Sequence, residues 1–266
     1  MLVLSNKFHL VYHPALVIFG PKLCPAPYDF MSRLWRVSKT CMNTRMITRI
    51  VQASDPVTLL GGGDLHPQDL NLALARAPVL VAADGGADAA LAAGHVPQAV
   101  IGDFDSLSAQ ARQRIPKDRL FHVPEQDSTD FDKALRHVSA PLVLGIGFLG
   151  GRLDHQLAVL NTLVRRGHRC LLIGAHEVVV HLPAQLHLDL QPGDTVSLFP
   201  MCAVSGRSHG LQWPIDGLAF APDGQVGTSN RAEGAVTLWT DGPGLLAMVP
   251  RARLDQVIRA VLSADA

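Results

Sequence analysis

The sequence predicts an α/β protein: an N-terminal Rossmann-like domain on a parallel sheet, followed by a small C-terminal β-sandwich domain. Short apolar runs alternate with helical patterns from Val57 to about Leu182, which is typical of a parallel, helix-covered sheet. After Pro183 the apolar runs are separated by Gly/Pro turns without long helical patterns, as in a sandwich. We therefore predict three segments: an extension over 1–52, an α/β domain over 53–184 and a β-sandwich domain over 185–266.

The predicted extension is basic, contains Asp29 as its single acid and shows no sustained periodicity. Three explanations stay open. The first is that it is a genuine N-terminal arm. The second is that it is a targeting segment, because a basic and acid-poor composition is that of transit peptides. The third is that it is upstream sequence read from an early start codon, with Met42 or Met46 as the true start. We predict that residues before about Val51 are poorly ordered and dispensable, because disorder concentrates at termini that nothing holds.

The α/β half is predicted in chain order as follows. Strands are expected at 57–60, 79–83, 99–101, 121–123, 142–145, 170–173 and 178–182. Helices are expected at 70–77, 87–93 (ending at Gly94), 128–138 and 153–166. In such sheets ligands bind beyond the carboxyl ends of the strands.

The C-terminal part is predicted to hold short strands at 187–190, 195–199, 218–221, 235–240 and 245–249. Residues 253–262 fit a short terminal helix or a last strand.

Composition excludes several classes of partner. The formal net charge of zero gives no support for nucleic acid or an anionic membrane as a partner. No apolar stretch reaches the roughly 20 residues of a membrane span. The four cysteines lack zinc-site spacing and are expected to be free thiols in a reducing cytoplasm.

Three acidic clusters follow predicted strands. They contain Asp84, then Asp103 and Asp105, then Asp127, Asp130 and Asp132. Magnesium prefers oxygen ligands and is often shared between Asp side chains and nucleotide phosphates. In an extended strand end, Asp103 and Asp105 would share one face while Phe104 points into the core. Turn formation or helix capping explains single members of these clusters, but not three clusters at three strand ends.

Two Gly-rich turns also follow strands, at 61–63 and 145–151. Such turns let the backbone approach phosphates at a helix N-terminus, although neither is a P-loop. Arg152 follows the second turn and is either a phosphate ligand or a surface residue. Trp213 is either a core residue or a flat face that stacks on a cationic ring. Ser229 and Asn230 either bind a heterocycle or form a turn.

Together these motifs resemble the thiamine pyrophosphokinase family. The matching residues are Asp84-Gly-Gly-Ala87, Gly102-Asp-Phe-Asp-Ser106, Gln126-Asp-Ser-Thr-Asp-Phe131 with Lys133, Gly150-Gly-Arg-Leu-Asp-His155 with Asn161, Gly210-Leu-x-Trp213 and Ser229-Asn230. The resemblance runs from about Val57 to the C-terminus. Glu125 departs from it, because many relatives have Asp there.

The resemblance implies a cytoplasmic, Mg²⁺-dependent homodimer that binds ATP in the α/β domain and thiamine where two subunits meet. It implies the following residues: for magnesium, Asp103, Asp105 and Asp130; for ATP, Asp84, Gly85, Gly86, Asp103, Gln126, Lys133, Gly151, Arg152, Asp154 and His155; for thiamine, Gln126, Trp213, Ser229 and Asn230; for catalysis, Asp103, Asp105, Asp127, Asp130 and Arg152.

The implied reaction transfers the pyrophosphoryl group of ATP to the hydroxyl of thiamine, which gives thiamine diphosphate and AMP. Asp103 or Asp127 could accept the hydroxyl proton, and the sequence does not decide between them. Two alternatives stay open: a magnesium-dependent phosphatase with an aspartyl nucleophile, and a non-catalytic thiamine or nucleotide sensor.

Overall fold

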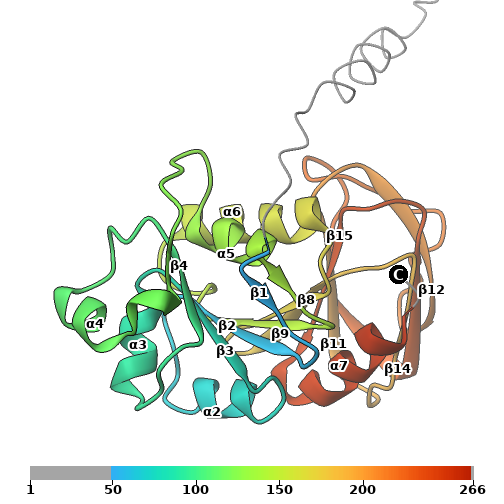
Figure 1. The fold of residues 1–266 in the computed structure, drawn as a ribbon. Coiled ribbons are helices and arrows are strands. Elements are labelled where there is room, and N and C mark those ends of the chain that lie inside the picture. The colour runs from blue at the N-terminus through green and yellow to red at the C-terminus, as the bar shows by residue number, and fades with distance from the viewer. Residues whose placement is uncertain (1–48, 265–266) are drawn as a thin grey trace, which may run out of the picture. The chain divides into compact units, whose positions relative to one another are not determined.

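One large mixed sheet organises the part of the chain that the structure, a computed structural model, describes, namely residues 49–264 (Figure 1). Six neighbouring strands form its parallel half, in the spatial order β5 (Leu120–His122), β4 (Ala99–Gly102), β3 (Val79–Ala83), β2 (Val57–Leu60), β7 (Val143–Ile146) and β8 (Cys170–Ile173). The predicted parallel strands are therefore present, with ends that differ by at most one residue.

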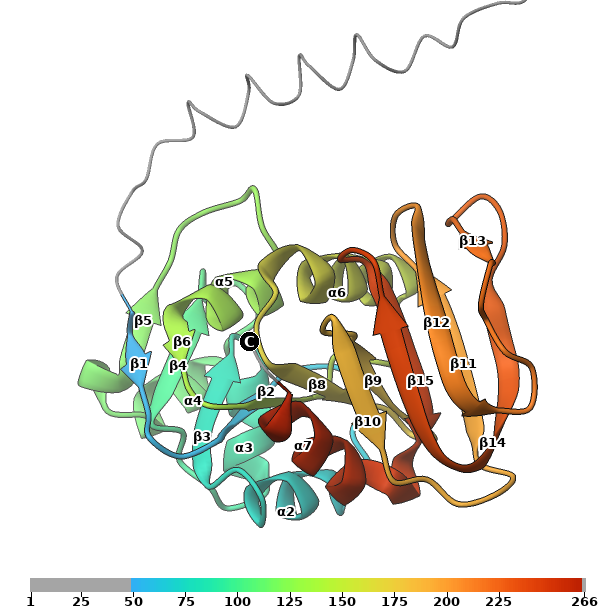
Figure 2. The same cartoon turned by 90° about the vertical axis from the view of Figure 1, so that its right-hand side faces the viewer.

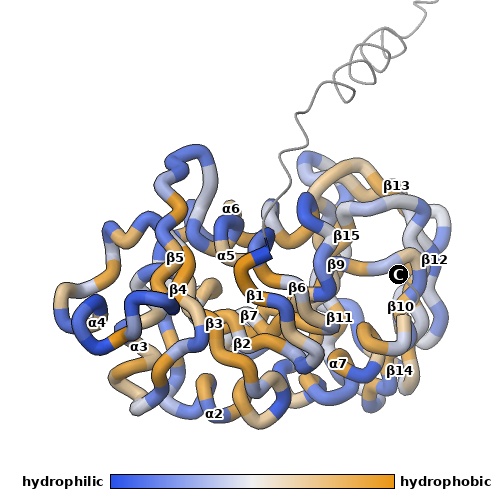
Figure 3. The backbone as a smooth tube through the Cα atoms, in the orientation of Figure 1, coloured by the Kyte–Doolittle hydropathy of each residue, from blue (hydrophilic) through white to orange (hydrophobic). Residues whose placement is uncertain are grey.

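Helices cover both faces of this half. They are α2 (Asp69–Leu74), α3 (Gly86–Ala92), α4 (Ala109–Arg114), α5 (Asp130–His137) and α6 (Leu153–Arg166). Side chains alternate across the strands: Leu59 packs in the core with α5 and α6, whereas Leu60 packs in the core with α2. The strands are buried and hydrophobic (Figure 3). The sequence missed α4, whose stretch has no strong apolar periodicity.

The predicted separate β-sandwich is not confirmed. The C-terminal strands instead extend the same sheet through β9 (Glu177–His181), β15 (Leu245–Pro250), β11 (Thr195–Pro200), β14 (Gly227–Thr240), β12 (Val204–Leu211) and β13 (Ala219–Phe220), while β10 (Gln185–Leu188) pairs with β14 off this path. All these pairings are antiparallel, and antiparallel pairs outnumber parallel pairs in the whole sheet. Figure 2 shows this half as a strongly twisted continuation of the parallel half.

Strand β14 explains why the prediction failed. Its first part pairs with β11 near Asn230, and its last part pairs with β10 and β12 near Thr237. Gly234 lies between these parts with a φ of 152°, which glycine adopts readily and other residues do not. The sequence predicted only 235–240 of this strand, because a Gly- and polar-rich first part carries little strand signal.

The C-terminal segment, which the sequence left open as a helix or a strand, is a helix. The short 3₁₀ turn η3 (Arg251–Arg253) leads into α7 (Leu254–Ser263), which buries Leu254, Val257 and Val261. Within residues 49–264, no helix combines the length and the apolarity needed to cross a bilayer.

The last residues of the predicted extension belong to the fold. Strand β1 (Val51–Gln52) pairs in parallel with β6 (Val138–Ser139), and the Ile50 amide donates to the His137 carbonyl at 2.9 Å. The arm prediction otherwise falls on residues 1–48, which lie outside the described residues. The sheet continues across the predicted domain boundary at residue 184, and that boundary stays a prediction.

Candidate active site

A cavity of about 510 Å³ lies at the carboxyl ends of the parallel strands. The sequence predicts ligands at this edge, and many of the predicted site residues line the cavity. They are Gly85, Asp103, Asp105, Gln126, Asp130, Lys133, Gly151, Arg152 and His155. Ser106, Ser128 and Phe148 also line it, although no role had been predicted for them.

Two glycine-rich loops form one wall of this cavity. The Gly63 amide donates to the Gly147 carbonyl at 2.9 Å, so the loops after β2 and β7 lie backbone to backbone. Gly147 has a φ of 71°, and a Cβ atom there would lie 2.6 Å from the Gly61 carbonyl oxygen. Because no side chain fits between the loops, this wall of the cavity includes backbone of glycine residues, to which a ligand can approach closely.

Three carboxylates converge beside the cavity: Asp103 and Asp105 line it, and Asp84 is buried next to them without lining it. One oxygen from each of Asp84, Asp103 and Asp105 lies within 4.8 Å of the others. Asp84 is buried, and its Oδ1 atom has no hydrogen-bond partner. Burial, with the charge of Asp130 as the next cause, raises the pKa of Asp84 to about 7. A buried and unpartnered carboxylate oxygen beside two further carboxylates fits a divalent cation that prefers oxygen ligands.

The predicted metal set, Asp103, Asp105 and Asp130, differs from this group in one member. Lys133 lies between Asp103 and Asp130, with its Nζ atom 2.7 Å from Asp103 Oδ2 and 3.1 Å from Asp130 Oδ1. The Lys133 hydrogen bond lowers the pKa of Asp103, whereas burial raises that of Asp130 despite Lys133. Asp84 therefore joins the carboxylate group in the structure, and the assignment of Asp130 stays a prediction.

Left-handed backbone marks three of the predicted motifs. Among residues 49–264, the non-glycine residues with positive φ are Asp84 (40°), Phe104 (66°) and Ser229 (62°). Such conformations cost free energy and are concentrated at functional sites. The prediction of an extended end around Phe104 is therefore wrong: the chain turns there. Phe104 is half-buried beside His122 and Arg112.

The rim of the cavity is polar and partly exposed. Gln126 donates from Nε2 to Asp103 Oδ2 at 3.2 Å. Arg152 pairs with Asp154 at 2.6 Å on the exposed surface at the start of α6. Arg152 is exposed and also lines the cavity, so it lies at the cavity mouth. Of the residues predicted for magnesium, ATP and catalysis, four are not among those that line the cavity, namely Asp84, Gly86, Asp127 and Asp154.

The predicted thiamine residues Trp213, Ser229 and Asn230 lie outside this cavity. The Trp213 side chain is exposed, which argues against a core role. Asn230 is buried and holds the backbone of Trp213 through two bonds, because its Oδ1 accepts from Trp213 N at 3.2 Å and its Nδ2 donates to Trp213 O at 2.6 Å. Asn230 thus positions the loop that presents the indole.

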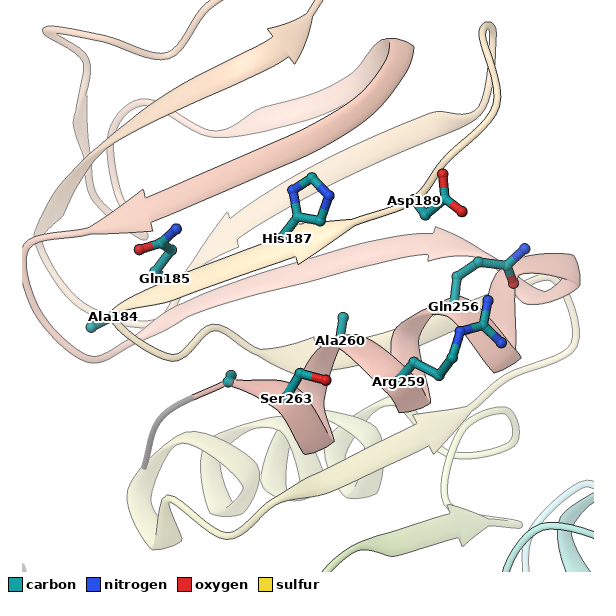
Figure 4. Close-up of a pocket in the computed structure, with 9 residues that line it drawn as sticks. Ala184, Gln185, His187, Asp189, Gln256, Arg259, Ala260 and Ser263 are labelled. Atoms are coloured by element: carbon teal, nitrogen blue, oxygen red, sulfur yellow. The ribbon is translucent and has the colours of Figure 1, made fainter.

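A second hollow of about 560 Å³ lies between β10 and α7 (Figure 4). Gln185, His187, Asp189, Gln256 and Arg259 line it, with side chains that project from the strand and the helix. It contains no predicted site residue and no group of three converging carboxylates. The candidate active site is therefore the cavity at the parallel strand ends.

Two family models match this chain. The model described as "Thiamin pyrophosphokinase, catalytic domain" matches residues 70–173, and "Thiamin pyrophosphokinase, vitamin B1 binding domain" matches residues 180–245. Thiamine pyrophosphokinase 3 of Oryza sativa subsp. japonica is 27% identical over 208 residues, which cover 64% of this chain and 78% of that protein. Thiamine pyrophosphokinase 1 of the same organism is 26% identical over 159 residues, which cover 52% of this chain and only 60% of that protein.

Solved structures share the fold. The structure of thiamin pyrophosphokinase from Candida albicans superposes with a TM-score of 0.65 at 16% identity, over 79% of this chain and 95% of that chain.

Proposed function

The chain belongs to the thiamine pyrophosphokinase family, whose two domain models together match more than half of it, and from this premise we propose that it converts thiamine and ATP to thiamine diphosphate and AMP. The thiamine hydroxyl oxygen attacks the β-phosphorus of ATP and forms the new P–O bond. The bond from that phosphorus to the α–β bridging oxygen breaks, AMP leaves, and the hydroxyl proton is released. One observation carries the proposal: three carboxylates and a buried lysine converge beside a cavity that two glycine loops wall on one side.

Asp103 and Asp105, with Asp84 as the third carboxylate, would hold a magnesium ion. Their oxygens lie close together, and one of them is buried without a partner. Bound magnesium would neutralise charge on the phosphate oxygens. Asp130 is the alternative third ligand that the sequence predicts, and its carboxylate shares Lys133 with Asp103.

The other side chains position the reactants and balance charge, which is most of what phosphoryl-type transfer requires. Lys133 keeps Asp103 ionised and in place. The glycine loops offer backbone amides to the phosphates, and Arg152 at the mouth supplies a guanidinium for a phosphate oxygen. Asp103 or Asp127 accepts the hydroxyl proton, and Gln126 contacts thiamine.

We further propose how the protein assembles and which part of the chain binds each substrate. Residues 53–184 bind ATP and residues 185–266 bind thiamine, in agreement with the separate matches of the two family models. The protein is a cytoplasmic homodimer. Trp213 stands exposed and outside the cavity, as expected if it completes the site of a partner subunit.

The direct test supplies ATP, Mg²⁺ and thiamine together and measures AMP and thiamine diphosphate. Formation of both products in equal amounts supports the proposal. Phosphate release from ATP without thiamine would support a phosphatase instead, and tight binding of thiamine and ATP without any product would support a sensor. Omission of Mg²⁺ should abolish turnover.

A further inference from the structure

Asp132 belongs to the third acidic cluster by sequence, but it does not line the cavity. It lies on α5 between Asp130 and Lys133, both of which do line it. Each residue of an α-helix advances about 100° around the axis, so Asp132 projects from nearly the opposite side of α5 to Asp130. Its side chain is only 2% exposed.

Two arginines in the last turn of α6 hold this buried carboxylate. Arg166 donates from Nε to Asp132 Oδ1 at 2.5 Å and from Nη2 to Oδ2 at 2.8 Å, and Arg165 Nη2 donates to Oδ2 at 2.9 Å. Burial alone would raise the pKa of Asp132, but the Arg166 hydrogen bond and the charges of both arginines hold it below the usual value. A two-point guanidinium–carboxylate contact is directional, unlike apolar packing.

The direction of this contact affects the orientation of α5, because α5 is short and few other polar contacts fix its rotation about its own axis. Phe131, Ala134 and Leu135 pack it onto the sheet, and this apolar contact resists separation more than rotation about the helix axis. A rotation would move Asp130 and Lys133 together, and Lys133 Nζ would lose its 2.7 Å contact with Asp103. Arg136, one turn after Asp132, forms a second anchor with Glu125 at 2.5 Å.

We propose that Asp132 is a positioning residue: its ion pairs with Arg165 and Arg166 set the rotation of α5, and thereby the placement of Asp130 and Lys133 at the Mg·ATP site. This inference rests on the proposed function for its ligand. It assigns to Asp132 an effect on the site that it exerts through α5 and not through contact with substrate.

The test compares Asp132→Asn with Asp194→Asn in the full chain. Asp194 forms a similar two-point ion pair with Arg253, at 2.6 and 3.2 Å, away from the cavity. For each variant we would measure the thermal midpoint, the Kd for Mg·ATP by calorimetry, and the kcat and KM for both substrates. We expect both variants to lower the midpoint. Only Asp132→Asn should weaken Mg·ATP binding, by about tenfold or more, while Asp194→Asn should stay within about twofold of the wild type.

Equal Kd values for the two variants, at similar losses of stability, would overturn the proposal. If Asp132→Asn fails to fold, Arg166→Lys decides, because it keeps the charge and loses the two-point contact. It should weaken Mg·ATP binding to an intermediate degree, and an unchanged Kd would contradict the proposal. A wild-type chain that binds Mg·ATP but makes no thiamine diphosphate would refute the proposed function, while the comparison of Kd values would still test Asp132.

Discussion

Asp84 and Asp130 compete for one role, the third carboxylate at a magnesium site with Asp103 and Asp105. The structure groups Asp84 with the other two and leaves its Oδ1 without a partner, whereas Asp130 is paired with Lys133. Substitution by Asn keeps the shape and removes the charge. Asp103→Asn and Asp105→Asn should each lower kcat/KM by on the order of 100-fold or more, because a ligand should cost at least as much as an outer-shell partner.

Asp84→Asn and Asp130→Asn then identify the third ligand. If Asp84 is that ligand, Asp84→Asn should raise the Mg²⁺ concentration for half-maximal activity at least about tenfold, more than Asp130→Asn does. A magnesium titration of steady-state rates checks this. If Asp130→Asn raises this Mg²⁺ concentration more than Asp84→Asn does, the third ligand is Asp130, as the sequence predicts. Near-normal turnover of Asp103→Asn or Asp105→Asn at saturating Mg²⁺ would refute the proposed magnesium site.

Trp213 is the residue that we expect to bind the acceptor. Trp213 is 54% exposed, and Asn230 fixes its backbone, so the loop presents the side chain to solvent, where a ligand can reach it. Stacking on the thiamine cation should contribute on the order of 1–2 kcal/mol. Trp213→Ala should therefore raise the KM for thiamine roughly tenfold, with a smaller effect on that for ATP. Unchanged KM values with a lowered thermal midpoint would make Trp213 a structural residue.

The site was predictable at the level of these residues because carboxylates and glycines at strand ends carry a local signal. The sequence placed Asp84 and Asp103 after two strands, and these strands, β3 and β4, are neighbours in the sheet. It did not show that Asp84 is buried beside Asp103, or that Asp132 turns toward α6. Both depend on how the chain turns at Phe104 and on the rotation of α5, which are tertiary properties.

At the scale of elements, α6 and β8 were predicted with their observed bounds, because each is apolar in a clear period or run. Strand β12 was missed, because a stretch of Gly, Ser, Arg and His has no strand pattern. It forms because β13 and β14 offer it hydrogen-bond partners. Pairing between distant segments overrides weak local propensity there.

Strand β1 is a small element whose contribution to the free energy of unfolding can be measured. It adds backbone hydrogen bonds to β6 and packs Val51 against the core. Of the two residues before it, Ile50 also packs against the core, and Arg49 donates from Nη1 to the Val138 carbonyl at 3.0 Å. Relative to a chain that begins at Met46, one that begins at Ala53 should lose about 2–3 kcal/mol of unfolding free energy. Its thermal midpoint should fall by roughly 4–10 °C.

Calorimetry of the two shortened chains and the full chain checks this expectation. If the chain that begins at Met46 matches the full chain in midpoint and activity, the residues before it are dispensable, as predicted from their composition. Equal midpoints for the chains beginning at Met46 and Ala53 would mean that the pairing of β1 with β6 adds nothing measurable to stability.

At the scale of the whole molecule, one continuous sheet joins the parallel half and the antiparallel half. Strand β8 pairs with β7 in parallel and with β9 in the antiparallel sense, so the change in sheet type lies at a single strand junction. The ion pair between the buried Asp69 and the partly buried Arg251 adds a second connection between the halves. The pattern of apolar runs changes at Pro183, from strands alternating with helices to short strands separated by Gly/Pro turns, and this change predicted two domains. It could not reveal that backbone pairing continues across that point.

This continuity makes the location of Trp213 informative. Trp213 and the carboxylates of the cavity belong to one sheet framework, yet Trp213 does not line the cavity. If thiamine binds between subunits, each complete site takes its acids from one chain and its Trp from the other. At a thiamine concentration well below the KM, an Asp103→Asn chain alone is expected to be nearly inactive, and a Trp213→Ala chain alone to keep about a tenth of the wild-type rate. When the two chains are mixed in equal amounts, random pairing makes half of the dimers mixed, and each mixed dimer has one intact site of two. About a quarter of wild-type activity should therefore return.

Steady-state rates of the mixture provide the measurement, with subunit exchange verified by mass spectrometry of differently tagged chains. Wild-type chain diluted with Asp103→Asn chain is the control for dilution, because each wild-type chain forms one intact site whether or not the subunits exchange. No recovery in a mixture that exchanges subunits would place the whole thiamine site within one chain.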